Sequence, residues 1–362
     1  MQQHKQINQL KKTAFNWMYK YSKCIPQEAL RDLDRAFKQF TNSWKKHGCR
    51  VGFPKFKKKN QCRESFRLTG VIRFYPDLKL VQLPRLGKLR LEEKPSIPPN
   101  GRILSITVSR TANRWYVSAT VEDTRPDPPP IQGEVLGVDT GLSRFAVLSN
   151  GLLLPAPKFL LRRLNKLRRL SRSHSRKQWG SKNRKKSAFR LARFYKRVSD
   201  CRHDFLHKTS LTLAKNHSML VVEDLYVKGL SMNKNQAKYW HDLAHGEFQR
   251  LLRYKTRWYG SSLVSVPRFF PSSKLCSNCL WYHTDLTLND KIFVCQLCGL
   301  KLNRDLNAAR NLVNYYHWHA PLLHPSIDSS CSSVAVSSLE TLNACGELVN
   351  PGTSGYDSMN QE

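Results

Sequence analysis

Three acidic residues stand where the sequence predicts an element to end or begin: Asp139, Glu223 and Asp305. Asp139 follows the apolar run at 135–138, Glu223 follows the run at 218–222, and Asp305 opens a helix with an apolar face. Strands of a parallel or mixed sheet bring such residues to one edge, where ligands bind. Carboxylates that converge there repel one another unless cations neutralise them. Mg²⁺ suits such ligands, and two ions about 4 Å apart can activate a water and stabilise the leaving oxygen of a phosphodiester. The three acids therefore predict a catalytic site that holds two Mg²⁺ ions.

Each of these acids also has an ordinary structural explanation. Asp139 begins an Asp-Thr-Gly turn, which also occurs in aspartic proteases, where a second such Asp shares a proton. The chain holds no second Asp-Thr-Gly, although a homodimer could supply one. Glu223 could pair with a lysine at a strand end, and Asp305 could stabilise a helix start through the helix dipole. Asp224 would point to the opposite face from Glu223 if the strand continues, so only one of the two can line the site. The ordered set of three favours the metal site.

Four cysteines in two close pairs form a second candidate metal site: Cys276, Cys279, Cys295 and Cys298. Two Cys-x-x-Cys pairs at this separation are typical of a zinc ribbon, in which four thiolates close a tetrahedral shell. A closed shell leaves no position for substrate, so we expect one structural Zn²⁺. Two disulfides or a redox pair are the alternatives. His283 lies between the pairs and is expected to face solvent.

The charge of the chain favours a polyanionic partner. Its 362 residues include 61 Lys and Arg against 26 Asp and Glu, a formal net charge of +35. Nucleic acid or an anionic membrane surface would balance such a surplus. No stretch approaches the ~20 apolar residues of a spanning helix, and no secretory signal opens the chain, so we expect a cytoplasmic protein without a membrane partner. The segment 158–197 carries 17 Lys and Arg and no acid, which favours phosphate contacts over an ordinary solvated helix face.

The pattern of apolar residues divides the chain into modules that would position these sites. We expect a helical lobe at 1–60, a small antiparallel β-barrel at 61–124 and a proline-rich linker at 125–132. An α/β domain follows at 133–270, and it includes two basic helices separated by a break near 179–183. The remaining modules are the zinc ribbon at 271–300, the last helix of the α/β domain at 301–319 and a serine-rich disordered tail at 320–362.

In its motifs the chain resembles TnpB, the family of transposon-encoded, RNA-guided nucleases of the OrfB transposase type, which is related to the type V CRISPR effectors. The resemblance rests on GVDTGLSRFAVLSNG at 137–151, VVEDL at 221–225, CSNC and CQLCG within 276–299, and NRDLNAARN at 303–311. It extends more loosely over about residues 20–315.

The resemblance implies a RuvC-like nuclease domain of RNase H-like fold with an inserted zinc ribbon, preceded by a helical lobe and a wedge-like barrel. It implies that Asp139, Glu223 and Asp305 are the catalytic residues. The implied activity is cleavage of double-stranded DNA that is selected by a guide RNA from the transposon end, with one protein copy per RNA. Base pairing would read the sequence, and the protein would read a short flanking motif.

Two features depart from the family pattern. Family members usually begin with a basic, aromatic strand that completes the barrel, whereas this chain begins in helical sequence, so we expect that strand to be absent. Asn303 stands where the family commonly has Asp. Some relatives that lost catalytic acids act as repressors, and the presence of all three acids here favours a nuclease. A transposase that acts without guide RNA and a non-catalytic nucleic-acid-binding regulator are the competing hypotheses.

Overall fold

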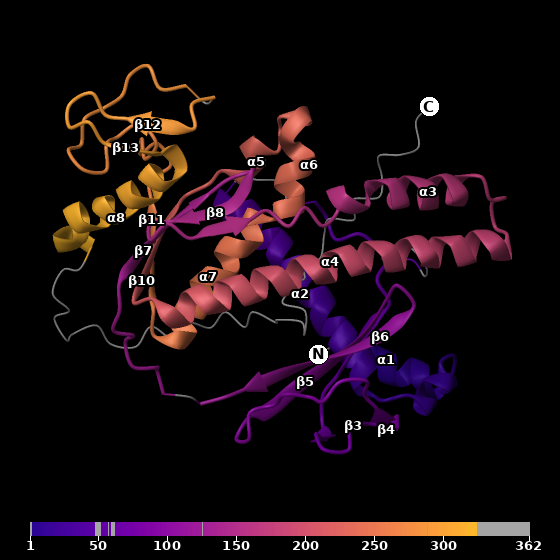
Figure 1. The fold of residues 1–362 in the computed structure, drawn as a ribbon. Helices are drawn as coiled ribbons and strands as arrows, with labels where there is room; N and C mark the ends of the chain where they lie inside the picture. Colours follow the sequence, from indigo (N-terminus) through magenta and orange to yellow (C-terminus); the bar gives the residue numbers. More distant parts are fainter. Residues whose placement is uncertain are drawn as a thin grey trace. The chain divides into compact units, whose positions relative to one another are not determined.

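The computed structural model describes residues 2–47, 52–56, 58, 62–124, 126–287 and 289–323. The chain divides between Arg125 and Pro126 into two compact units, and each of them has its own core. Figure 1 shows the elements of both units coloured along the sequence.

The first unit consists of helices followed by antiparallel strands. Its helical elements are α1 (Gln2–Lys12), the 3-10 helix η1 (Asn16–Lys20) and α2 (Cys24–His47). Its strands are β1 (Ser65–Leu68), β2 (Arg73–Tyr75), β3 (Leu80–Leu83), β4 (Gly87–Arg90), β5 (Arg102–Thr111) and β6 (Arg114–Glu122). They form two three-stranded sheets in the orders β1-β5-β6 and β2-β3-β4. Both sheets contribute to one apolar core, which contains Leu68, Val81, Leu83 and Ile106.

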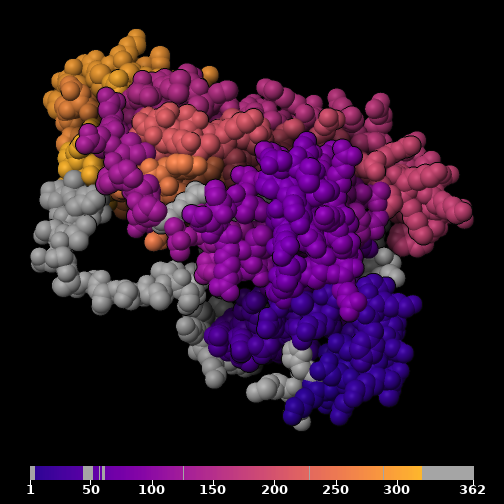
Figure 2. Space-filling view, turned by 90° about the horizontal axis from the view of Figure 1, so that it is seen from below, coloured from indigo at the N-terminus to yellow at the C-terminus, as the bar shows by residue number. Residues whose placement is uncertain are grey.

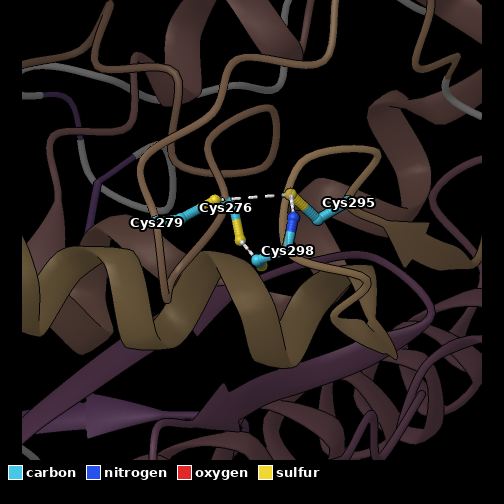
Figure 3. Close-up of side chains that lie close together, drawn as sticks. All are labelled: Cys276, Cys279, Cys295 and Cys298. Atoms are coloured by element: carbon cyan, nitrogen blue, oxygen red, sulfur yellow. Dashed lines mark hydrogen bonds between the residues drawn. The ribbon is translucent and has the colours of Figure 1, made fainter.

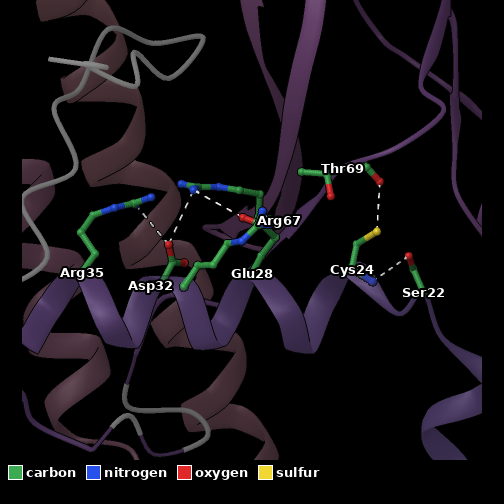
Figure 4. Close-up of polar contacts among 8 residues, drawn as sticks. Ser22, Cys24, Glu28, Asp32, Arg35, Arg67 and Thr69 are labelled. Carbon is green, nitrogen blue, oxygen red and sulfur yellow. Dashed lines mark hydrogen bonds and ion pairs between the residues drawn. The ribbon is translucent and has the colours of Figure 1, made fainter. Parts of the chain in front are cut away.

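Helix α2 is attached to β1 by a cluster of polar contacts (Figure 4). The buried Glu28 accepts a hydrogen bond from Arg31 at 2.5 Å and lies 4.0 Å from Arg67 of β1. Arg67 also lies 3.6 Å from Asp32, one helical turn further along α2. The thiol of Cys24 donates to the carbonyl of Thr69 at 3.2 Å. These contacts place the first long helix against the β1 end of its sheet.

The second unit is built on a mixed five-stranded sheet in the order β11-β10-β7-β8-β9. Its strands are β7 (Val135–Thr140), β8 (Arg144–Leu148), β9 (Leu153–Pro155), β10 (Met219–Glu223) and β11 (Ser262–Val266). Strand β8 pairs antiparallel with both β7 and β9, whereas β10 is parallel to both β7 and β11. Asn150 and Gly151 form the tight turn between β8 and β9, and Gly151 adopts the positive φ of 90° that this turn requires.

Helices cover both faces of this sheet, as Figure 1 shows. The helical elements of the second unit are η2 (Leu161–Arg163), α3 (Leu164–Ser175), α4 (Lys182–Asn216), α5 (Val227–Leu230), α6 (Lys234–Leu243), α7 (His245–Tyr259) and α8 (Arg304–Leu323). Along β10, Leu220 and Val222 pack with residues of α4 and α7, whereas Met219 and Val221 pack with Leu312 of α8. Successive residues of a strand point to opposite faces, so the continuous apolar run of β10 reflects a strand that is covered on both sides.

Helix α8 approaches β7 unusually closely at a glycine. A Cβ atom on Gly137 would lie 2.0 Å from the carbonyl oxygen of Ala309. Glycine is therefore required at this point of the strand, because any larger residue would displace the helix.

Several boundaries differ from those predicted. The polar stretch after Glu223 contains α5 and α6, which the sequence did not predict, and the ribbon contains the short antiparallel strands β12 (Ile292–Val294) and β13 (Lys301–Asn303). The predicted disordered tail at 320–362 begins too early, because α8 continues to Leu323; residues 324–362 lie outside the described residues. The two basic helices and the break between them are confirmed by α3, α4 and the turn at 176–181. None of the helices in the described ranges is both long and apolar enough to cross a membrane.

Candidate active site and metal centre

The three predicted acids lie on three elements of the second unit. Asp139 is opposite Val147 in the pairing of β7 with β8, Glu223 is the last residue of β10, and Asp305 lies in the first turn of α8. Gly137 and Val221 face α8, and Asp139 and Glu223 follow them by two residues, so both acids belong to the face that α8 covers. The strand alternation and the helix start therefore direct the three side chains to one end of the sheet.

The electrostatics of Asp139 reflect this proximity. Burial of its carboxyl group raises its pKa well above the ordinary value, and the charges of Glu223 and Asp305 raise it further, whereas Arg304 opposes the rise. Burial also raises the pKa of Glu223, and a hydrogen bond from Ser272 opposes this change. Two neighbouring carboxyl groups whose pKa values are raised in this way are a strong candidate for a cation site.

Backbone and side-chain contacts fix two of the acids. The side-chain oxygen of Asn303 accepts hydrogen bonds from the backbone N–H groups of Asp305 at 3.1 Å and Leu306 at 3.4 Å, so Asn303 caps α8. The carbonyl of Glu223 accepts a hydrogen bond from Gln249 of α7 at 2.8 Å, and its carboxylate accepts one from the hydroxyl of Ser272 at 2.5 Å. Sequence reasoning missed Gln249 and Ser272, because neither forms a recognisable motif with the acids.

Asp224 takes no part in this group. It forms an ion pair with Arg268 at 2.9 Å, and the guanidinium of Arg268 lies over the ring of Tyr226 at 4.9 Å. β10 ends at Glu223, so Asp224 lies beyond the strand, and its carboxylate is engaged by Arg268.

The four cysteines come together between β11 and α8 (Figure 3). Their sulfur atoms all lie within 4.8 Å of one another, with 3.6 Å between Cys276 and Cys298 and 3.4 Å between Cys279 and Cys295. All four are free thiols, so the disulfide alternative is wrong. Among the described residues this is the one group of three or more His, Cys, Asp and Glu side chains whose ligand atoms lie close enough together to hold one ion. The three carboxylates do not form such a group. Four thiols in this arrangement can hold one tetrahedral ion.

His283 does not join this group, and its predicted orientation toward solvent is wrong. Its ring is half-buried and packs against Trp281 and Phe293 at centroid distances of 5.1 and 5.9 Å. It therefore forms part of the small core beneath the cysteines.

A row of asparagines on α8 attaches the cysteine module to the helix that carries Asp305. Asn307 donates to the carbonyl of Leu275 at 2.6 Å and accepts from the backbone N–H of Ser277 at 3.0 Å. Asn311 donates to the same carbonyl at 2.7 Å, and Asn314 donates to the carbonyl of Ser277 at 2.9 Å. The spacing of these asparagines places them on one helix face, which is the signal in the sequence that could have revealed this role.

The basic helices form an elongated hairpin whose far end is exposed. No described residue of α3 is buried, and Trp179 in the turn between α3 and α4 has 82% of its surface exposed. The guanidinium of Arg184 lies over its ring at 4.7 Å. In the space-filling view the rose-coloured end of this hairpin forms a lobe of the surface (Figure 2). Exposed cations with a presented aromatic ring are suited to nucleic-acid backbones and bases.

This combination of an acidic sheet end, a four-cysteine module and a basic surface defines a class of proteins that act on nucleic acids. Residues 118–234 match the OrfB_IS605 family, described as "Probable transposase", and residues 245–312 match the Cas12f1-like TNB domain. A protein of Streptomyces pristinaespiralis named "Putative RNA-guided DNA endonuclease" is 36% identical over 288 residues, which cover 79% of this chain and 70% of that protein. The Escherichia coli protein named "Putative RNA-guided DNA endonuclease InsQ" is 30% identical over 306 residues, which cover 80% of this chain and 74% of that one.

The chain belongs to the TnpB family. Among solved structures it is similar to a chain of a CRISPR-Cas12f ternary complex, with 19% identity and a TM-score of 0.38. That match covers 59% of this chain and 46% of the other.

Proposed function

We propose that this protein is an RNA-guided DNA endonuclease of a transposable element, and that it hydrolyses phosphodiesters at Asp139, Glu223 and Asp305. The observation that carries the proposal is the buried carboxyl group of Asp139 within reach of the charges of Glu223 and Asp305, in a chain whose relatives are named RNA-guided DNA endonucleases. The net charge of +35 supports a nucleic-acid substrate.

The order of the strands supports an RNase H-like, RuvC-like fold for the second unit. Three consecutive antiparallel strands are followed by two strands that lie parallel to the first, and the sheet order is β9-β8-β7-β10-β11. In the first unit, the single core shared by both antiparallel sheets supports a barrel of the wedge type.

The chemistry would depend on ions that the three carboxylates hold. Their oxygen atoms fit Mg²⁺. Burial, together with repulsion from Glu223 and Asp305, raises the pKa of Asp139, and bound cations would relieve both effects. Two bound ions would supply activation of the attacking water and stabilisation of the leaving oxygen. Ser272 would keep the carboxylate of Glu223 in place, and Asn303 would hold the backbone of Asp305. The N-terminal end of α8 favours negative charge at the position of Asp305.

The cysteine module fits a structural Zn²⁺ ion. Its four sulfurs provide a complete set of ligands, and the asparagine contacts of α8 connect this module to the helix that carries Asp305. We assign it a role in holding that part of the nuclease together.

The partners we propose are a guide RNA from the transposon end and double-stranded target DNA. One protein copy would bind each RNA, and the complex would act in the cytoplasm. The hairpin of α3 and α4 is the surface we assign to phosphate contacts, because its cations and Trp179 are exposed.

A transposase that acts without guide RNA is the second candidate, and the description of the matched family as "Probable transposase" favours it. A non-catalytic regulator is less favoured, because all three acids are present.

Expression from the native locus, purification, and sequencing of the bound RNA separate these candidates. We expect a defined RNA from the transposon end, and we expect Mg²⁺-dependent cleavage of DNA that matches its guide segment. Strand joining by RNA-free protein would support the transposase, and binding of DNA without cleavage would support the regulator.

A further inference from the structure

Glu223 receives a hydrogen bond from a residue outside the three acids. The hydroxyl of Ser272 donates to the Oε1 atom of Glu223 at 2.5 Å, across 49 residues of sequence. A hydroxyl that donates to a carboxylate over this distance forms a strong, charge-assisted bond. The bond occupies one carboxylate oxygen from the protein side and fixes the rotation of the group.

Ser272 is itself rigidly held. Only 6% of its surface is exposed, and its backbone N–H donates to the carbonyl of Phe270 at 2.8 Å. Its carbonyl accepts a hydrogen bond at 2.8 Å from Asn311 of α8, a residue with no exposed surface. Asn311 also holds the carbonyl of Leu275, next to the first cysteine of the metal module. The hydrogen bond from Asn311 of α8 therefore fixes the backbone of Ser272, which carries the hydroxyl.

The backbone of Glu223 is held as well as its side chain. Gln249 of α7 binds its carbonyl at 2.8 Å, and its backbone is paired with Val266 of β11. These contacts determine the position of its Cα atom but leave its side chain free to rotate. Among the described residues, it is the hydroxyl of Ser272 that donates a hydrogen bond to this carboxylate.

We propose that Ser272 is a positioning residue, whose hydroxyl holds the carboxylate of Glu223 in the orientation that binds Mg²⁺. The inference rests on the proposed function, because it assigns Glu223 to a metal site. Groups that hydrogen-bond to metal ligands orient them, and their loss typically costs about 10–100-fold in metal affinity or activity. We therefore expect Ser272 to act on metal affinity rather than on nucleic-acid binding.

The test compares four variants of the RNA-loaded protein in DNA cleavage across a Mg²⁺ titration. Ser272→Ala removes only the hydroxyl, and Ser272→Thr keeps it. Ser273→Ala is the matched control, because it removes the neighbouring hydroxyl and leaves the hydrogen bond from Ser272 to Glu223 intact. Glu223→Gln removes the charge of the carboxylate that Ser272 holds. Bound zinc, bound RNA and the melting temperature are measured for each, so that a folding defect is separated from a metal-binding defect.

We expect Ser272→Ala to raise the Mg²⁺ concentration for half-maximal cleavage by about tenfold or more. Bound zinc and RNA should be unchanged, and Ser272→Thr and Ser273→Ala should behave as the parent does. A parental Mg²⁺ titration for Ser272→Ala, while Glu223→Gln is inactive, would overturn this inference and leave the proposed function intact. Lower activity with an unchanged half-maximal Mg²⁺ concentration would also overturn it, because it indicates a structural role only. Parental cleavage by Glu223→Gln would instead contradict the proposed site itself.

Discussion

The side-chain oxygen of Asn303 lies 3.1 Å from the backbone nitrogen of Asp305 and accepts its hydrogen bond. The same oxygen accepts a weaker bond from Leu306 at 3.4 Å, so one side chain satisfies two of the unpaired N–H groups at the start of α8. The family resemblance leads us to expect Asp at this position, and Asn and Asp are comparable as helix caps. The departure from the family pattern therefore preserves the structural role of the residue.

Removal of this cap should loosen the start of α8. We expect Asn303→Ala to lower the free energy of unfolding by about 0.5–2 kcal/mol, whereas Asn303→Asp should stay close to the parent. Denaturant unfolding of the three proteins measures this difference. An alanine variant as stable as the parent would show that the cap contributes nothing.

The close approach of α8 to β7 gives a second prediction. Gly137→Ala would place a Cβ atom 2.0 Å from the carbonyl oxygen of Ala309, so the helix that carries Asp305 must move. We expect the free energy of unfolding to fall by about 1–3 kcal/mol, and we expect a large loss of DNA cleavage. Gly133→Ala is the control, because its Cβ would meet its nearest neighbour at an ordinary 3.5 Å. Equal melting temperatures for the two variants would contradict this close packing.

Lys255 should make the free energy of unfolding change with pH in the alkaline range. It is 6% exposed and donates to the carbonyl of His207 at 2.6 Å and to the hydroxyl of Ser210 at 2.8 Å, which joins α7 to α4. Burial lowers its pKa to about 8 from an ordinary value of 10.5. Between these two values the unfolded chain holds the proton that the folded protein has released, so the contribution of Lys255 to stability rises with pH.

Comparison with Lys255→Met isolates this contribution. Between pH 8 and pH 10 we expect the parent to gain about 1–2 kcal/mol relative to the variant, because one pKa unit corresponds to about 1.4 kcal/mol. Urea unfolding at several pH values measures it. A constant difference across this range would show that the pKa of Lys255 is not lowered.

The cysteine module should depend on its metal. We expect Cys279→Ser to abolish zinc binding and to make the segment 271–303 sensitive to proteolysis, because structural zinc contributes directly to the folding of small modules. Cys62→Ser, at an exposed cysteine outside the module, should retain one zinc per chain. Elemental analysis measures the metal content. Full zinc content in Cys279→Ser would refute the four-cysteine assignment.

The sequence predicted those features that depend on local pattern. The apolar runs before Asp139 and Glu223 indicated buried strands, and the two Cys-x-x-Cys pairs indicated the cluster that the structure contains. It did not predict α5 and α6, because their polar residues provide little periodic signal. The contacts of Ser272 and Gln249 with Glu223 were also missed, since each joins residues brought together only by the tertiary fold.

The most direct test of the proposed function is cleavage by Asp139→Ala, purified with its RNA and supplied with Mg²⁺ and a matching DNA target. We predict that this variant binds as much RNA as the parent and does not cut the DNA, because it lacks one of the three carboxylates that hold the ions. Cleavage by the variant at the rate of the parent would contradict the assignment of Asp139, and with it the proposed catalytic site.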